Sequence, residues 1–365
     1  MTYPASAAIG RHAIVRALAS TPEQGLEQIT LESQSPPDPA ELGDDEVVIA
    51  VRSANVGWVD VLMTSGQYQH VPEPPYTPGL ELAGEIVWRG ANVTSVEIGA
   101  KVIADGLETG PRSLGAHRRW GGFASWAVAP AHAVIPLPTG FSFDEGACLL
   151  GGAETAFHAL VYRGNVRPGE TVLVLGATGS TGLAACAMAK LLGARVIAVG
   201  RSPAKLERAT KVGAHDVIAV TGDIRLRDEV KRLTDGHGAD VIYDPIGGEA
   251  SIAALRAAAF GARFVVVGWS STPLVARGGR DANTLPTNLI LMKSIDVLGS
   301  PAVIAVHRDR SIRTERLARI LAWADAGELR PQIGATFELE DLREALRAKW
   351  ESRFAGNVVV RPRDQ

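Results

Sequence analysis

The chain has 365 residues, enough for two or three domains, and its 46% hydrophobic and 21% charged residues are typical of a globular protein. A net charge of −3 argues against a nucleic-acid partner. No run of about 18 apolar residues predicts a membrane span, and the start of the chain lacks the basic and apolar regions of a secretory signal. We therefore expect a cytoplasmic protein with no membrane partner.

The first part of the chain has the pattern of a β-rich domain. Residues 1–12 are expected to form a loose tail. Strand-like runs then occur at Glu46–Val51, Leu82–Trp88 and Lys101–Ala104, bounded by glycines, which predicts a barrel-like arrangement. Residues 105–121 contain four glycines and a proline without any periodicity, so this segment is predicted to be a long loop.

Strands and helices alternate in the middle of the chain. The predicted helices are Ala153–Arg163, Leu183–Leu192, Ser202–Val212, Ile224–Leu233 and 250–259. The predicted strands are Thr171–Leu175, Arg195–Val199, Asp216–Val220, Asp240–Tyr243 and Arg263–Val267. Continuous apolar strands that alternate with helices indicate a parallel sheet covered on both faces.

The last part returns to a mixed pattern. An amphipathic helix is predicted at Arg316–Asp325, and short strands at Thr336–Leu339 and Asn357–Val360 flank a helix at Leu342–Trp350. The simplest α/β architecture has a doubly wound domain at 153–304. It is inserted into a β-rich domain formed by 1–152 and 305–365.

The strongest chemical signal is the sequence VLVLGATGSTG at Val172–Gly182, where a strand runs into a glycine-rich turn and then a helix. Gly176 permits the tight turn, Gly179 permits approach of a pyrophosphate, and Gly182 permits close packing of helix on strand. The helix N-terminus adds N–H donors for phosphates. We predict dinucleotide binding by Gly176, Ala177, Thr178, Gly179, Ser180, Thr181 and Gly182; the alternative is a tight turn without a ligand.

The residues after the second strand predict which dinucleotide is bound. Folds that bind NAD place an acidic residue there to hold the ribose 2′-hydroxyl. This chain has Gly200, Arg201 and Ser202 instead, with Lys205 one turn later. A guanidinium suits a 2′-phosphate, so NADPH is predicted over NADH; the alternative is that Arg201 is a solvated surface charge.

Five motifs occur in a specific order along nearly the whole chain: DVLMTSGQY at Asp60–Tyr68, PGLELAG at Pro78–Gly84, RPGETVLVLGATGSTG at Arg167–Gly182, DPIGG at Asp244–Gly248 and NLILMKSIDVLG at Asn288–Gly299. With them the chain resembles the quinone oxidoreductase branch of the medium-chain dehydrogenase/reductase superfamily. The resemblance implies a GroES-like catalytic domain, a Rossmann domain and an active site in the cleft between them. It also implies a homodimer formed by edge strands near Phe264–Val267 and Asp296–Gly299.

The resemblance also predicts that no metal is bound. Zinc-dependent relatives have a cysteine near the position of Gly57–Trp58 and a His–Glu pair at the position of Leu80–Glu81. Here the cysteine is absent and leucine replaces the histidine. Cys148 and Cys186 lie in apolar runs, and we interpret both as reduced core thiols.

Further cofactor contacts are predicted at two places. Loops at Ile246–Gly247 and Gly268–Ser270 follow predicted strands, and such loops border the cofactor in open α/β sheets. The resemblance adds Arg353, from an ESR motif that reaches the 2′-phosphate in related reductases, and Asn357. One departure is Val220, where relatives often have a tyrosine near the adenosine phosphate.

Without zinc the chemistry suits an acceptor that is already activated by conjugation, such as a quinone or an enone. The resemblance nominates Tyr68 as the donor to the forming enolate, or else as a residue that only packs. Gly57, Trp58, Trp120 and Trp269 are expected to line the substrate pocket, while Trp126 is expected in the core. Many relatives have asparagine where Gly57 stands.

Three functions follow as hypotheses. The first is an NADPH-dependent quinone or enone reductase with a small-molecule substrate. The second is an enoyl-thioester reductase, for which only the 105–121 loop offers an anchor for a carrier phosphate. The third is a non-catalytic NADPH-binding protein with a structural role, as in lens crystallins, or with a sensing role.

Overall fold

The computed structural model describes residues 9–113, 115–221, 225–272 and 283–363. The chain divides into two compact units, Met1–Leu150 with Ile333–Gln365, and Gly151–Gln332. These boundaries differ from the predicted ones mainly where the chain returns from the second unit to the first. The return was predicted at residue 305, but residues 305–332 belong to the second unit. There, Arg313 and Arg316 of helix α11 (Ser311–Asp325) both form ion pairs with the buried Glu154.

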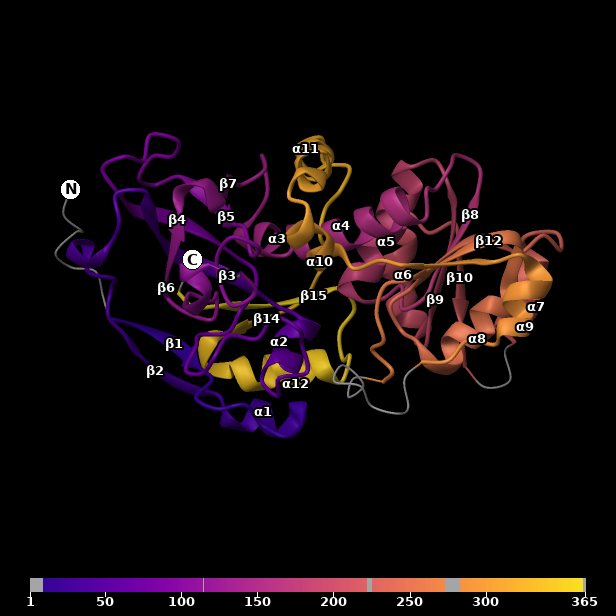
Figure 1. The fold of residues 1–365 in the computed structure, drawn as a ribbon, viewed down its shortest axis with the longest axis horizontal. Helices are drawn as coiled ribbons and strands as arrows, with labels where there is room; N and C mark the ends of the chain where they lie inside the picture. The colour runs from indigo at the N-terminus through magenta and orange to yellow at the C-terminus, as the bar shows by residue number, and fades with distance from the viewer. Residues whose placement is uncertain (1–8, 114, 222–224, 273–282, 364–365) are drawn as a thin grey trace. The chain divides into compact units, whose positions relative to one another are not determined.

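The first unit is built on a seven-stranded sheet of order β14-β15-β3-β4-β5-β7, with β6 paired to β3 (Figure 1). All pairs are antiparallel except β14 with β15. The strands are β3 (Glu46–Val56), β4 (Leu82–Arg89), β5 (Lys101–Ala104), β6 (Trp126–Pro130), β7 (Val134–Pro136), β14 (Ile333–Glu338) and β15 (Asn357–Arg361). The three strands predicted before residue 150 are confirmed as β3, β4 and β5.

The amino-terminal region is more ordered than the sequence suggested. Strand β1 (Gly10–Ile14) pairs with β2 (Thr30–Gln34), so residues 10–12 are not part of a loose tail; residues 1–8 lie outside the described residues. The helices of this unit are α1 (Pro22–Gln28), α2 (Trp58–Met63), α3 (Phe143–Ala147) and α12 (Leu342–Trp350). Helix α12 matches its predicted bounds and packs against α1 and α2.

The second unit contains a six-stranded parallel sheet of order β10-β9-β8-β11-β12-β13. Its strands are β8 (Thr171–Val174), β9 (Arg195–Gly200), β10 (Asp216–Ala219), β11 (Ala239–Asp244), β12 (Ala258–Val266) and β13 (Asp296–Gly299). From the middle of the sheet, β8, β9 and β10 follow one another toward one side, and β11, β12 and β13 follow one another toward the other side. The switch point therefore lies between β8 and β11, where ligands bind in open α/β sheets.

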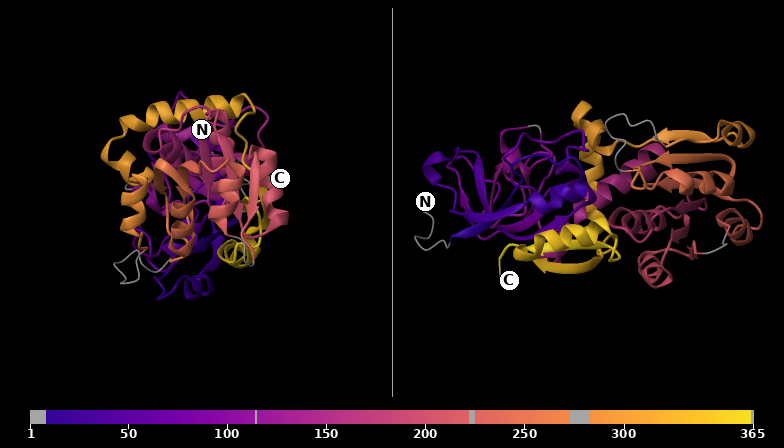
Figure 2. Two further views of the ribbon diagram at one scale, coloured as in Figure 1. Left: turned by 90° about the vertical axis from the view of Figure 1, so that its right-hand side faces the viewer. Right: turned by 90° about the horizontal axis from the view of Figure 1, so that it is seen from below.

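Helices cover both faces of this sheet (Figures 1 and 2). Helices α5 (Ser180–Leu191) and α6 (Pro203–Val212) pack together beside β8, β9 and β10. Helices α7 (Leu226–Leu233), α8 (Gly248–Ala257) and α9 (Thr287–Lys293) come after the reversal of the strand order, and right-handed crossovers then place them on the opposite face. The predicted parallel sheet with two covered faces is thus confirmed.

The remaining helices of the second unit come from the beginning and from the end of its stretch of the chain. Helix α4 (Leu149–Phe157) passes directly into a π-helical segment, His158–Arg163, and α10 (Ala302–Arg308) precedes α11. The predicted helix Ala153–Arg163 is therefore one α-helix plus one wider turn. No described helix has the length and hydrophobicity needed to cross a membrane.

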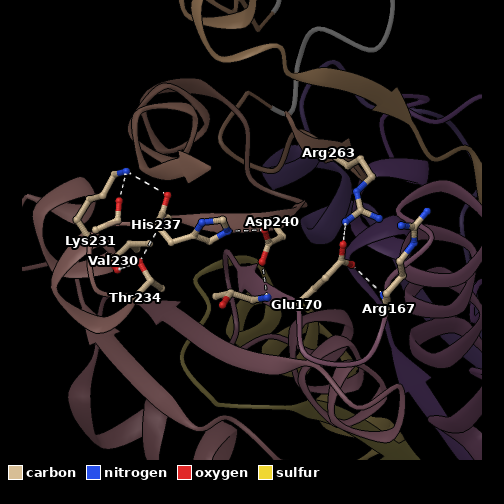
Figure 3. A network of polar contacts seen from close by, with 11 residues as sticks. Arg167, Glu170, Val230, Lys231, Thr234, His237, Asp240 and Arg263 are labelled. Carbon is tan, nitrogen blue, oxygen red and sulfur yellow. Dashed lines mark hydrogen bonds and ion pairs between the residues drawn. The ribbon is translucent and has the colours of Figure 1, made fainter. Parts of the chain in front are cut away.

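The amino ends of the parallel strands are closed by a polar network (Figure 3). Asp240 accepts the Thr171 N–H at 2.8 Å and lies 2.7 Å from His237 Nε2. Glu170 pairs with Arg263, whose guanidinium also donates to the Gly164 carbonyl at 2.6 Å. These groups satisfy one another's hydrogen-bonding needs at the amino ends of the strands.

Candidate active site

The loop between β8 and α5 has the close backbone approach that its glycines predict. A β-carbon on Gly182 would lie 2.8 Å from Ala177 Cα and 2.9 Å from the Gly176 carbonyl carbon, so this helix position has no room for a side chain. Gly176 has φ +59°, a left-handed conformation that favours glycine. A β-carbon on Gly179, in contrast, would meet only the Gly176 carbonyl oxygen, at 3.5 Å. Gly179 therefore leaves open space beside the loop.

The amino end of α5 faces this space. Its N-cap is Gly179, which has no side chain to satisfy the first N–H groups of the helix. Thr178, Ser180 and Thr181 are half-buried, so the loop stays accessible. The amino end of a 12-residue helix with a glycine N-cap and no side-chain cap is a favourable site for a phosphate group.

Three further loops lie at the same carboxyl edge of the sheet. Of the predicted residues, Gly200 ends β9 and is followed by Arg201 and Ser202. Ile246 and Gly247 follow β11, and Gly268, Trp269 and Ser270 follow β12. They are neighbours in space: a β-carbon on Gly200 would lie 3.2 Å from Thr178 Cγ2, and one on Gly176 would lie 2.7 Å from Ile246 Cδ1. The structure thus brings together the cofactor residues predicted in the second unit.

Asp244 organises two of these loops, a role that the sequence analysis missed. Its buried carboxylate accepts the N–H groups of Ile246 at 2.8 Å and Gly247 at 3.0 Å, and Ser251 donates to its other oxygen. Its carbonyl accepts the Val267 N–H at 2.8 Å, which ties the loop after β11 to the loop after β12. The DPIGG motif contained this signal, since an Asp that ends a strand before two glycines is a common loop-forming residue.

The side chain of Arg201 is exposed at the end of β9. Among the residues that the structure describes, no carboxylate forms an ion pair with it. Lys205 lies one turn into α6 and is half-buried. This part of the edge carries positive charge close to the glycine loop.

Arg353 and Asn357, the other two predicted cofactor residues, belong to the first unit. The Arg353 guanidinium lies 2.6 Å from a Glu351 oxygen and also pairs with Glu344, and these carboxylates raise its pKa. Its charge is already compensated by two neighbours. Asn357 is buried at the start of β15.

The first unit contains a buried carboxyl group, Asp60 in α2. It accepts backbone N–H groups from Gly57 at 2.8 Å, Gly79 at 3.2 Å and Leu80 at 3.1 Å. Burial, together with the negative charge of Glu81, raises its pKa to about 7, although the N–H groups of Gly57 and Gly79 and the charge of Arg112 lower it. A β-carbon on Gly57 would lie 2.9 Å from Asp60 Oδ2, so a side chain at this predicted pocket position would press on the Asp60 carboxylate.

Glu81 lies beside this group and accepts a hydrogen bond from Asn55 Nδ2 at 2.7 Å. Burial lowers the pKa of Lys349 on α12, while the negative charges of Glu81 and Asp60 oppose that effect. Burial raises the pKa of Cys148 well above the usual range and that of Cys186 to about 12, so both remain thiols. The described residues contain no group of three or more His, Cys, Asp and Glu side chains arranged to hold a metal.

Tyr68 follows α2 and is half-buried. His70 lies edge-on to its ring at 6.0 Å between ring centroids. Burial raises the pKa of the Tyr68 phenol, and the Arg112 charge lowers it. The sequence analysis did not identify Arg112, since one arginine in an aperiodic loop carries no signal of its own.

The predicted pocket tryptophans have different neighbours. Trp58 stacks on Trp350 at 4.5 Å between ring centroids, whereas Trp120 packs at the edge of a core cluster that contains Trp126. Trp126 is 4% exposed, as its predicted core position requires. Trp269 lies in the second unit and is 40% exposed.

Comparison with known proteins identifies the family. Residues 43–139 match the alcohol dehydrogenase GroES-like domain, and residues 180–309 match the zinc-binding dehydrogenase family. A quinone oxidoreductase-like protein 2 homolog of Nematostella vectensis is 33% identical over 321 residues, which cover 87% of this chain and 82% of that protein. The chain belongs to the medium-chain dehydrogenase/reductase superfamily, in its quinone oxidoreductase branch.

Other members of the superfamily are similar over most of the chain. The quinone oxidoreductase-like protein 2 of Mus musculus is 31% identical and covers 88% of the chain and 86% of its own length. A solved structure of a probable oxidoreductase from Mycobacterium abscessus has a TM-score of 0.80 at 27% identity, covering 97% of this chain and all of its own. A structure described as an NAD-dependent alcohol dehydrogenase has the same TM-score at 29% identity, covering 96% and 99%. The GroES-like and Rossmann domains expected of the superfamily are confirmed.

Proposed function

We propose that this member of the superfamily is an NADPH-dependent, zinc-independent reductase of conjugated carbonyl compounds such as quinones and enones. The observation that carries the proposal is the carboxyl edge of the parallel sheet. There an open glycine loop lies beside an exposed Arg201, and no acidic residue follows β9.

The residues at this edge fit a dinucleotide. The open space at Gly179 and the amino end of α5 suit the pyrophosphate, and Ile246, Gly247 and the loop 268–270 suit the nicotinamide side. Arg201 and Lys205 suit a 2′-phosphate. When bound, the reduced nicotinamide supplies a hydride, and this chain supplies orientation and a proton.

The residues where zinc-dependent relatives have ligands do not fit a metal. Gly57 has no side chain, Leu80 has no donor atom, and Glu81 is held by Asn55. Cys148 has a strongly raised pKa, which disfavours the thiolate that zinc prefers. We therefore propose chemistry without a Lewis acid, in which Tyr68 donates to the carbonyl oxygen as negative charge develops there.

A direct test compares NADPH and NADH oxidation with a panel of quinones, enones and enoyl-CoA esters, in the presence of a chelator. We expect turnover with NADPH that the chelator leaves unchanged. Preference for an enoyl-CoA ester would favour the enoyl-thioester hypothesis, and tight NADPH binding without turnover on any acceptor would favour the non-catalytic one. Preference for NADH, as in the relative described as NAD-dependent, would contradict the proposed role of Arg201.

Arg201→Gln gives the sharpest prediction for cofactor choice. Because a charged hydrogen bond to a phosphate is worth about 1.5–3 kcal/mol, the variant is expected to bind NADPH roughly 10- to 100-fold more weakly. Binding of NADH, which has no 2′-phosphate, is expected to change less than threefold. Titration calorimetry with both cofactors measures the two effects, and Arg227→Gln, an exposed arginine on α7, is the matched control.

We also propose that the chain forms a homodimer through β13, the edge strand of the six-stranded sheet. Leu291 is 82% exposed, Met292 is 72% exposed and Val297 on β13 is 41% exposed. The other predicted edge, Phe264–Val267, is wrong, because β12 pairs with β11 on one side and β13 on the other. An equilibrium sedimentation experiment tests the proposal, and a monomer at micromolar concentration would contradict it.

A further inference from the structure

The loop after β11 has three successive N–H groups, at Ile246, Gly247 and Gly248, and each of them donates to a side chain. Those of Ile246 and Gly247 donate to the Asp244 carboxylate. The Gly248 N–H donates to Asn283 Oδ1 at 2.8 Å. Because a backbone N–H can only donate, the Asn283 amide must turn its oxygen toward the loop. The single hydrogen of each N–H group is therefore already engaged within the protein.

Asn283 comes from a position 35 residues further along the chain than Gly248. Helix α8 starts at Gly248, and its N-cap Gly247 has no side chain, so Asn283 supplies the cap from another segment. Gly247 has φ +80°, which favours glycine, and a β-carbon on it would lie 2.5 Å from Asn283 Nδ2. Thr272 Oγ1 donates to Asn283 Oδ1 at 3.3 Å. Asn283 thus ties the loop after β11 to the loop after β12.

Ile246 is held on both sides of its peptide unit. Its N–H donates to Asp244, and its carbonyl accepts the Ser271 N–H at 2.9 Å and the Ser271 hydroxyl at 2.8 Å. Both lone pairs of this carbonyl are then used, which leaves the Ile246 side chain as the part that can contact a ligand. That side chain lies against the glycine loop, since a β-carbon on Gly176 would be 2.7 Å from Ile246 Cδ1.

We propose that Asn283 is a positioning residue for the nicotinamide half of the cofactor. It holds the loop after β11 so that Ile246 presents an apolar surface beside the glycine loop, and the nicotinamide riboside packs on that surface. This role rests on the proposed function, in which a dinucleotide lies along the carboxyl edge of the sheet. Since the N–H groups of the loop are engaged, the loop contacts the cofactor by packing and donates no hydrogen bond to it.

Loss of the Asn283 amide would release the Gly248 N–H and the Thr272 hydroxyl together, and the cofactor would then have to order the loop as it binds. One net hydrogen bond corresponds to roughly a two- to tenfold change in a binding constant. The effect should be confined to the nicotinamide half. Arg201 and Lys205, proposed for the 2′-phosphate, follow β9, which lies on the other side of β8 from β11.

The test compares NADPH with 2′,5′-ADP, which has the adenosine phosphates but no nicotinamide. For Asn283→Ala we expect titration calorimetry to show roughly three- to tenfold weaker binding of NADPH, and a change of less than about twofold for 2′,5′-ADP. In the free protein, the peptide that contains Gly248 should exchange its amide hydrogens faster. Asn283→Asp keeps an acceptor oxygen and should recover part of both effects. Thr284→Ala, which removes an exposed side chain next to Asn283, should change neither.

The outcomes separate this role from the proposed function. If Asn283→Ala bound NADPH as tightly as the wild type, or lost affinity for NADPH and 2′,5′-ADP equally, Asn283 would not position the nicotinamide half, whatever the enzyme reduces. If the wild type preferred NADH, the proposed choice of NADPH would fail, and the same comparison of NADH with 5′-AMP would decide the role of Asn283. A wild type that bound neither dinucleotide would overturn both proposals.

A second variant decides the question should Asn283→Ala not fold. Thr272→Val removes the other hydrogen bond to Asn283 Oδ1 and keeps the shape of the side chain. Weaker binding of NADPH with unchanged binding of 2′,5′-ADP would support the role of Asn283. Unchanged binding of both would overturn it.

Discussion

Gly182→Ala is expected to destabilise the second unit and to abolish tight cofactor binding at the same time. The added methyl group would meet the Gly176 carbonyl oxygen and lie 2.8 Å from Ala177 Cα, both of which are backbone atoms. Helix α5 would have to move away from β8. Overpacking of this kind costs roughly 1–3 kcal/mol, and the displaced helix would no longer direct its N–H groups at the phosphates.

Gly179→Ala is the matched variant that separates the two effects. A β-carbon there would meet only the Gly176 carbonyl oxygen, at an ordinary 3.5 Å, so the free protein is expected to keep its unfolding temperature. The same methyl group would occupy the space proposed for the pyrophosphate. NADPH affinity should therefore fall at least tenfold in both variants, while only Gly182→Ala melts earlier.

Differential scanning calorimetry without ligand and a fluorescence titration with NADPH measure both quantities. If Gly179→Ala bound NADPH as tightly as the wild type, the pyrophosphate would not lie at this loop. If Gly182→Ala melted like the wild type, the close packing of α5 on β8 would not be needed for stability.

The sequence predicted the second unit well, because its signals are local. An apolar run such as Arg195–Val199 followed by glycine marks a buried strand, and the structure extends this one only to Gly200. The π-helical turn at His158–Arg163 could not be predicted, since the apolar periodicity of its residues is the same as that of the α-helix before it. Asn288–Gly299 was recognised as a motif, yet its helix α9 was not assigned from its pattern.

The first unit was predicted less completely, because much of it depends on contacts between distant segments. Strands β1 and β2 are short and stabilised by pairing with each other, and β6 and β7 have few residues from which to read a period. The hydrogen bond from Gln34 Nε2 to the Trp126 carbonyl likewise joins residues 92 positions apart in the chain. Such pairs have no local sequence signature. The motifs could therefore predict which segments form the candidate site, but not which of their side chains contact one another.

The contacts of Asp60 could not be predicted from the sequence either, and they lead to the second prediction with a large expected effect. One aspartate in the sequence WVDVLM carries no sign that it binds N–H groups from residues 79 and 80. Asp60→Ala would leave three buried or partly buried N–H groups without an acceptor. At about 1–3 kcal/mol for each, we expect a loss of roughly 3 kcal/mol or more in the free energy of unfolding of the first unit.

Hydrogen exchange locates this effect better than a global melting curve, since a two-domain chain need not unfold in one step. Peptides that span Gly57 and Gly79–Leu80 should exchange faster in Asp60→Ala, while those from β8 and α5 should not change. Asp45→Ala, an exposed aspartate in the same unit, is the control. Unchanged protection at Gly57 and at Gly79–Leu80 would show that Asp60 is not their acceptor.

Asp60→Asn adds a pH dependence whose sign follows from the raised pKa. Because burial raises the pKa of Asp60 from 3.8 to about 7, the folded protein binds its proton more tightly than the unfolded chain does. The resulting stability is fully present below about pH 4 and is lost as the pH rises through 7. Asparagine cannot titrate and lacks this contribution at every pH.

The stability difference between wild type and Asp60→Asn should therefore shift against the wild type, by up to about 4 kcal/mol, as the pH rises from 4 to 8. A difference that stays constant over this range would mean that Asp60 is already ionised at low pH, held in that state by its three N–H donors.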